Sequence, residues 1–311
     1  MGSGTFTSHD WASYASAKVK GKSTSQIYTA TAMKDEYNPK NVVRESRDSD
    51  EHPNSTPIII GLDVTGSMSN ILNEVAQQLG DMVLEILDRK PVDDPQIMFN
   101  AIGDSHCDEY PLQATQFESD IRIAKQLTDL YFERGGGGNN FESYPLAWWF
   151  AANHTSTDNF EKRGKKGFLF TMGDDGYPTK LYRQHLEEIF GDDIEKDSID
   201  TKEVLSQVCR KYEVFHLCLK EGSNMSGYWA DHGEADRVIN QWTGLLGERA
   251  IPVSDYTKIP QIIVSILETM AGKSVEEVVN SWDGSTAVVV REAISGLTEK
   301  KEEKELIEFN E

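Results

Sequence analysis

Oxygen-bearing side chains follow an apolar run early in the chain. The segment TPIIIGLDVTGSMSN occupies residues 56–70, with Asp63, Thr65 and Ser67 at alternate positions directly after the apolar residues. One such residue would be enough to cap a following helix, so three exceed what capping requires. Carboxylate and hydroxyl oxygens are hard ligands that suit Mg²⁺, Mn²⁺ or Ca²⁺ rather than zinc. The pattern therefore favours a divalent-metal site at the end of a strand.

Other kinds of site need residues that this segment lacks. A phosphate-binding loop of the GxxxxGK[ST] type requires Lys followed by Ser or Thr, which neither this turn nor GGGGNN at 135–140 provides. The GxGxxG fingerprint of dinucleotide-binding proteins is also missing after the predicted strand. A haloacid-type phosphatase would carry a second aspartate where Thr65 stands. The Asp-Thr-Gly-Ser motif of aspartic proteases belongs to all-β proteins, and Val64 interrupts it here.

From Pro57 onward, predicted strands alternate with predicted helices. An apolar, β-branched run predicts a strand at 57–64, and further strands are predicted at 96–104, 167–172, 213–220 and 249–254, with a short edge strand at 111–117. Helical spacing predicts helices at 68–88, 120–133, 146–154, 181–190, 201–212, 232–247, 259–272 and from 274 to about 295. This alternation predicts an α/β fold with a doubly wound, mostly parallel sheet flanked by helices. Ligands bind such sheets at the carboxyl ends of the strands, which points to the polar loops 63–67, 103–109, 135–143 and 173–178.

The spacing Asp63-x-Thr65-x-Ser67 after an apolar strand resembles the DxSxS motif of von Willebrand factor A (vWA, or VWFA) domains. In that family the motif belongs to the metal-ion-dependent adhesion site, or MIDAS, of a Rossmann-like fold. The resemblance covers roughly residues 57 to 272. It implies that an aspartate after the fourth strand completes the site. The segment FTMGDDG matches that element, which makes Asp174 the expected ligand and Asp175 the second choice.

The glycine-rich loop departs from the family pattern. The resemblance implies a threonine ligand from this loop, and the glycines are present at 135–138 without that threonine. Asn139, Asn140 and Glu142 stand nearby and are the candidates to replace it, with Ser143 next to them. If Glu142 were the ligand, the site would be more anionic, and the bound ion would attract a partner carboxylate less strongly.

The chain as a whole is acidic. It has 311 residues and a formal net charge of −21, while residues 1–56 are neutral, so the excess charge lies in residues 57–311. Such a surface repels nucleic acid and anionic lipid, and we expect neither as a partner. The sequence contains no stretch of 18 apolar residues and no signal peptide pattern, so we expect a cytoplasmic protein.

The sequence predicts three parts. Residues 1–56 form a polar N-terminal arm with a short strand near SQIYTATAM, residues 57–274 form the vWA-like domain, and residues 275–311 form a C-terminal helix and a charged tail. The combination of RESRDSDEHPNSTP, DVTGSM and GGGGNNFESY resembles stand-alone vWA proteins of bacteria and their phages. A site rich in oxygen ligands, without an evident base or nucleophile, favours a non-enzymatic protein that binds Mg²⁺, or Mn²⁺ or Ca²⁺. Its protein partner would supply an acidic residue to the ion, and an AAA+ ATPase of the MoxR type is one candidate.

Two other functions stay open at the sequence level. A metal-dependent hydrolase of phosphoester-type substrates could use the additional acids Asp104, Asp108, Glu142 and Asp175 to hold a second ion or to act as a base. A structural or assembly protein with a degenerate metal site would explain the missing threonine. The turn GDSHCDE at 103–109 could form a rim of the site, although we favour a solvated polar turn.

Overall fold

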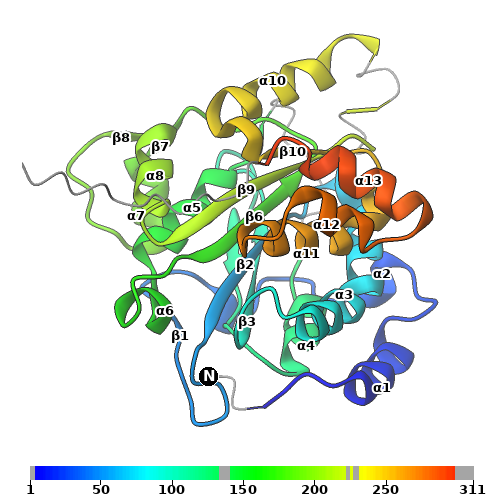
Figure 1. The fold of residues 1–311 in the computed structure, drawn as a ribbon. Coiled ribbons are helices and arrows are strands. Elements are labelled where there is room, and N and C mark those ends of the chain that lie inside the picture. The colour runs from blue at the N-terminus through cyan, green and yellow to red at the C-terminus, as the bar shows by residue number, and fades with distance from the viewer. Residues whose placement is uncertain (1–3, 133–140, 222–224, 227–230, 298–311) are drawn as a thin grey trace, which may run out of the picture.

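A six-stranded sheet forms the centre of the molecule (Figure 1). The computed structural model describes residues 4–132, 141–221, 225–226 and 231–297. The strand order is β10-β9-β6-β2-β3-β4, and every neighbouring pair is parallel except β3 and β4. The α/β fold class predicted from the sequence is therefore confirmed. The strands are β2 (Thr56–Asp63), β3 (Pro95–Ile102), β4 (Leu112–Ala114), β6 (Gly167–Gly173), β9 (Tyr212–Leu219) and β10 (Ala250–Val253).

Helices cover both faces of the sheet (Figure 1). Along β2 the side chains of Ile58 and Ile60 enter one apolar core and that of Ile59 enters the other, because successive strand residues point to opposite faces. The first core is covered by α1 (Ser8–Lys18), α2 (Thr24–Ile27), α3 (Ser69–Arg89), α4 (Arg122–Thr128), α11 (Ile259–Met270), α12 (Val275–Asn280) and α13 (Gly284–Ile294). The second is covered by α5 (Tyr144–Asn153), α7 (Arg183–Phe190), α8 (Thr201–Val208) and α10 (Glu234–Leu246).

Several predicted elements differ from the observed ones. The predicted helix 181–190 begins only at Arg183, because residues before it belong to β7 (Lys180–Tyr182), which pairs antiparallel with β8 (Ser198–Asp200). The predicted helix after residue 274 is two helices, α12 and α13. The strand predicted near SQIYTATAM is wrong: Ser23 and Gln26 form a capping box that starts the short helix α2.

The N-terminal segment packs against the first apolar core. Phe6, Trp11, Val19, Tyr28 and Tyr37 are all buried there, beside helix α3. The Tyr28 hydroxyl also donates a hydrogen bond of 3.1 Å to the carbonyl oxygen of residue 72. Residues 4–43 therefore belong to the same packed structure as the sheet, although their sequence is rich in polar residues.

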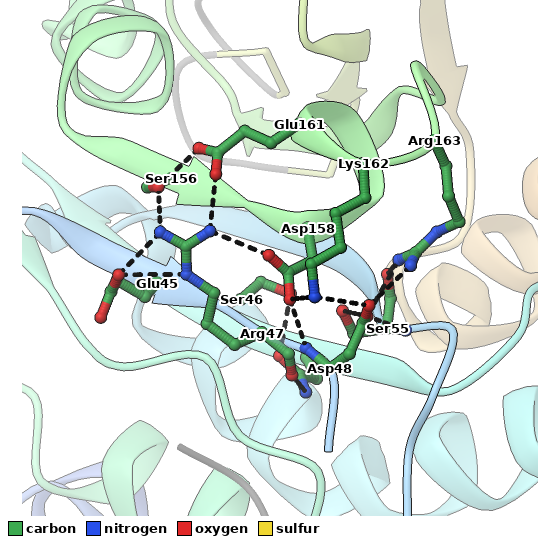
Figure 2. Close-up of polar contacts among 11 residues, drawn as sticks. Glu45, Ser46, Arg47, Asp48, Ser55, Ser156, Asp158, Glu161, Lys162 and Arg163 are labelled. Carbon is green, nitrogen blue, oxygen red and sulfur yellow. Dashed lines mark hydrogen bonds and ion pairs between the residues drawn. The ribbon is translucent and has the colours of Figure 1, made fainter. Parts of the chain in front are cut away.

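The polar stretch that follows is held by ion pairs rather than by apolar packing (Figure 2). Strand β1 (Arg44–Ser46) pairs in parallel with β5 (Thr155–Thr157), next to the short helix α6 (Asp158–Glu161). Arg47 contacts Asp158 at 3.0 Å and Glu161 at 2.6 Å. Asp48 contacts Arg163 at 2.8 Å and accepts a hydrogen bond of 2.7 Å from the Ser55 hydroxyl. These contacts fix residues 44–56 to the body of the protein.

The parallel register brings three loops to one edge of the sheet. Asp63 at the end of β2 lies level with Ile102 of β3, and Leu62 lies level with Met172 of β6. The residues after β2, β3 and β6 therefore emerge side by side, as the parallel-sheet prediction requires. Within the described ranges, no helix combines the length and apolar character needed to cross a membrane.

Candidate metal site

Asp63 is fully buried at the carboxyl end of β2. One of its carboxylate oxygens, Oδ1, accepts hydrogen bonds from the Thr65 amide at 2.9 Å and from the Thr65 hydroxyl at 2.6 Å. The other, Oδ2, accepts a hydrogen bond of 2.9 Å from the Tyr144 hydroxyl on α5. The structure thus brings Asp63 and Thr65 together, and it adds a tyrosine that the sequence analysis did not identify.

Helix α3 does not use these residues as its cap. Its N-cap is Met68, which makes no side-chain capping hydrogen bond. A single 3₁₀ turn, η2 (Gly66–Met68), separates Thr65 from the helix. The backbone of Ser67 lies in that turn, while its side chain lies outside the described part of the structure. The N-cap residue of α3 is therefore Met68, and neither Asp63 nor Thr65 holds that position.

Asp174 follows β6, the strand next to β2, and is also fully buried. Burial, and next the negative charge of Asp174, raise the pKa of Asp63 above its usual range. Because residue 173 is glycine, no side chain occupies the space beside Tyr144 and Asp63. A Cβ atom at Gly173 would lie 1.9 Å from the Tyr144 hydroxyl oxygen and 2.9 Å from Asp63 Oδ2. The predicted pair Asp63 and Asp174 is thus buried on neighbouring strands, where the charge of Asp174 acts on Asp63.

Asp175, the second choice after β6, faces helix α10 on one side. Its Oδ1 accepts a hydrogen bond of 2.9 Å from the Gly176 amide and lies 3.8 Å from the Arg237 guanidinium of α10. Burial, opposed by the Gly176 hydrogen bond and reinforced by Asp174, raises the pKa of Asp175 to about 7. Arg237 therefore offsets part of the charge of Asp175.

Glu142 is the described member of the glycine-loop candidates, since Asn139 and Asn140 lie outside the described residues. Its side chain is buried, and its Oε2 has no hydrogen-bond partner among the described residues. Burial, and next the charge of Asp63, strongly raise its pKa. The neighbouring Ser143 hydroxyl turns elsewhere and donates to Asp104 Oδ1 at 3.3 Å.

An aromatic cluster from α5, β9 and α10 lies beside the site. The ring of Tyr144 packs edge-on against His216 and Trp242, whose rings stack with centroids 3.5 Å apart. Trp242 on α10 donates a hydrogen bond of 3.0 Å to the carbonyl oxygen of Asp175. These residues fix the loops after β2 and β6 relative to each other. They gave no signal in the sequence, because a tyrosine or tryptophan on an apolar helix face is indistinguishable from an ordinary core residue.

The turn after β3 is more buried than its sequence suggests. The sequence favours a solvated polar turn, yet Asp104 is fully buried and Asp108 is partly buried. Asp104 Oδ1 accepts hydrogen bonds of 3.0 Å from the amide and from Nδ1 of His106, and Oδ2 accepts one of 3.2 Å from the Cys107 thiol. The buried carboxylate organises the turn, and His106 and Cys107 are exposed.

The side chains at the ends of β2 and β6 fit a hard divalent cation. Two buried carboxylates that repel each other, beside the Thr65 hydroxyl, form an arrangement that a cation would stabilise. Among the described residues, no three His, Cys, Asp or Glu side chains converge closely enough to hold an ion together. Glu142 and Asp175 therefore do not join Asp63 and Asp174 in one compact carboxylate cluster. The candidate ligands described at this point are two carboxylates and the hydroxyl group of Thr65.

Comparison with known proteins identifies no family. No family model matches the chain, and no curated protein matches it. Among solved structures, the open conformation of the pilus adhesin SpaC from Lactobacillus rhamnosus GG has a TM-score of 0.43 at 11% identity, covering 76% of this chain and 31% of that one. Proximal thread matrix protein 1 from the mussel byssus has a TM-score of 0.42 at 11% identity, covering 74% and 48%. This chain thus spans less than half of either protein, and likeness of this size carries no conclusion about the site.

Proposed function

We propose that the protein binds a divalent metal ion and uses it to mediate metal-dependent protein–protein interaction without catalysis. The observation that supports this proposal best is the buried pair of carboxylates, Asp63 and Asp174, at the ends of adjacent parallel strands. Asp63, Thr65, Ser67 and Asp174 would hold the ion, with Mg²⁺ as the expected metal and Mn²⁺ or Ca²⁺ as substitutes. Oxygen ligands of this kind are those that Mg²⁺ prefers.

The ligand set suggests how the ion would act. Two carboxylates balance the charge of a dication only when both are ionised, and hydroxyl ligands add no charge. An ion held in this way at a loop edge retains affinity for a further oxygen ligand, such as a glutamate or aspartate of a protein partner. The sequence resemblance to vWA domains favours the same mode of binding, and it suggests an AAA+ ATPase of the MoxR type in the cytoplasm as a partner to test.

Titration calorimetry with Mg²⁺ and Mn²⁺ tests the metal site directly. We expect stoichiometric binding to the wild type and none to Asp63→Ala. Asp255→Ala is a matched control, because Asp255 accepts hydrogen bonds from the amide and hydroxyl of Thr257 at 2.9 and 2.6 Å, as Asp63 does from Thr65. That variant should bind the ion normally. Equal binding by the wild type and Asp63→Ala would show that the site is assigned wrongly.

Affinity capture from a lysate, with Mg²⁺ or with EDTA, tests the interaction. We expect a partner that elutes with EDTA and is not captured by Asp63→Ala. A partner retained equally in both conditions would favour the structural alternative with a degenerate site. Turnover of generic phosphoester substrates with Mn²⁺, above that of a Ser67→Ala control, would favour the hydrolase alternative and contradict a non-catalytic role.

A further inference from the structure

A cavity of about 450 Å³ lies beside the turn after β3, apart from the Asp63 site. Its walls come from residues 38–40 of the N-terminal segment, from the turn at 105–112 and from helix α7. Its volume falls within the range of small-ligand sites. Two histidines from different elements, His106 and His185, line it together. Neither histidine belongs to the candidate metal site at Asp63.

His106 is held in the arrangement that proteins use for histidine ligands of metals. Its Nδ1 lies 3.0 Å from Oδ1 of the fully buried Asp104. Since a carboxylate accepts hydrogen bonds and does not donate them, Nδ1 carries the proton and Nε2 carries the free lone pair. A carboxylate behind a histidine fixes its tautomer, orients its ring and increases its basicity as a ligand. The exposed imidazole is therefore prepared to bind through Nε2.

His185 of α7 supplies a second imidazole next to the first. The two ring centroids lie 4.9 Å apart, with the ring planes at 85°. Zinc–nitrogen bonds of about 2.0–2.1 Å place the centroids of two imidazoles on one tetrahedral ion roughly 5 Å apart. Nδ1 of His185 is buried and has no hydrogen-bond partner among the described residues. Burying a polar nitrogen without a hydrogen-bond partner costs folding free energy. This cost favours a bound ion or ligand as the missing partner of His185 Nδ1.

The charges around the cavity favour a cation. Among the described residues, three carboxylates line the cavity (Asp108, Glu109 and Glu188), together with one lysine, Lys40. The Cys107 thiol also lies there and donates to Asp104, so it is already engaged. No three potential ligands converge among the described residues, so two imidazoles would leave the other positions to water or to a small ligand in the cavity.

We propose that His106 and His185 form a second cation site, specific for a borderline transition-metal dication such as Zn²⁺ and distinct from the oxygen-ligand site at Asp63. Imidazole nitrogen binds Zn²⁺, Cu²⁺ and Ni²⁺ well and Mg²⁺ poorly, so the two sites would select different ions. Asp104 acts as a positioning residue behind His106. The open coordination positions face a cavity large enough for a small molecule with an anionic or nitrogen donor group.

Titration of the full-length protein with ZnCl₂, followed by calorimetry, tests this site. We expect one equivalent of Zn²⁺ to bind in the presence of excess Mg²⁺. His106→Gln and His185→Gln should each weaken zinc binding by at least about tenfold. Loss of a residue that only supports a metal ligand already weakens metal affinity by about that factor. His9→Gln is the matched control, because His9 is an exposed histidine of α1 outside the cavity. It should leave zinc binding unchanged.

Further variants separate this site from its neighbours. Cys107→Ser and Asp63→Ala should both retain zinc binding, whereas Asp63→Ala should lose Mg²⁺ binding. The absorption spectrum of bound Co²⁺ should change in both histidine variants, which a purely structural effect would not produce in a folded protein. The proposal is overturned if the wild type binds no stoichiometric zinc, or if zinc binding survives in either His106→Gln or His185→Gln while circular dichroism shows a folded chain.

Discussion

The same local turn occurs twice in this protein. Asp63 accepts hydrogen bonds from the amide and hydroxyl of Thr65, and Asp255 accepts the same pair from Thr257 with the same lengths. Asp255 is partly exposed and Asp63 is fully buried beside Asp174. An Asp-x-Thr sequence therefore fixes a turn, and the second buried carboxylate distinguishes a candidate metal site from an ordinary turn.

Removal of the Tyr144 hydroxyl should destabilise the protein. Tyr144→Phe leaves Asp63 Oδ2 buried without this donor, which costs about 1–3 kcal/mol of unfolding free energy. Tyr177→Phe is the control, because its hydroxyl bonds the carbonyl oxygen of Gln241 at 3.3 Å in a half-buried position. Urea unfolding of both variants checks this, and equal losses would contradict a special role for the Tyr144–Asp63 contact.

Gly173→Ala should disrupt the site through a steric clash. The added Cβ would overlap the Tyr144 hydroxyl and press on Asp63, so we expect a loss of about 1–3 kcal/mol in stability and weaker Mg²⁺ binding. Gly244→Ala in helix α10 meets nothing within 4 Å and should be neutral or stabilising by up to about 1 kcal/mol. Normal Mg²⁺ affinity in Gly173→Ala would show that the space Gly173 leaves for Tyr144 and Asp63 is not needed.

At the scale of elements, Gly80 of helix α3 leaves room for Trp11 of helix α1. Gly80 lies in the interior of α3, where glycine is unfavourable, and a Cβ there would lie 2.1 Å from the ring of Trp11 on α1. Trp11 is buried in the first apolar core. The glycine therefore provides the space into which the N-terminal helix docks.

A double-mutant cycle tests this docking. Gly80→Ala should destabilise the wild type, because the new methyl group meets the indole. In a Trp11→Ala background, itself destabilised by about 3–5 kcal/mol, the same change should stabilise by up to about 1 kcal/mol through better helix propensity. Unfolding free energies of the four proteins give the coupling. A stabilising effect of Gly80→Ala in both backgrounds would contradict the packing of α1 on α3.

The ion pairs of residues 44–56 should make the protein sensitive to acid. The Arg163 guanidinium holds the pKa of Asp48 well below its usual range. A lowered pKa in the folded state contributes stability that is complete above the unfolded pKa of about 3.9 and is lost as the pH falls below it. Asp48→Asn should therefore lose less stability than the wild type between about pH 4 and pH 2. Unfolding free energies that fall in parallel over this range would contradict this contribution.

At the scale of the whole molecule, the acidic surface needs a control in any metal experiment. With a net charge of −21, any salt can stabilise the protein by screening repulsion. At matched ionic strength, MgCl₂ should raise the unfolding temperature of the wild type more than NaCl does. The extra stabilisation is about 2.7 kcal/mol at a hundredfold excess over Kd. Asp63→Ala should respond equally to both salts, and an equal response in the wild type would contradict specific binding.

The sequence pattern predicted the sheet well and the N-terminal segment poorly. The central strands β2, β3 and β6 are short, mostly apolar runs that are buried along their whole length, so their apolar pattern is visible in the sequence. Strand β1 is held by charged neighbours such as Arg47 and Asp158, and ion pairs leave no periodic signal. Trp11 is the buried residue of helix α1. One buried side chain does not produce a helical pattern of apolar residues, so the sequence did not predict that α1 packs against the core.

The sequence by itself determined the turn at Asp63 and Thr65 and the alternation of strands and helices that gathers the carboxyl ends of parallel strands, that before Asp174 included, at one edge of the sheet. Both depend on neighbours in the chain or on the general rules of parallel sheets. Tertiary structure decided that Tyr144, 81 residues away, donates to Asp63, and that His106 and His185 share one cavity. Such contacts join residues whose approach depends on how helices pack on the sheet, so side-chain spacing along the chain carries no information about them.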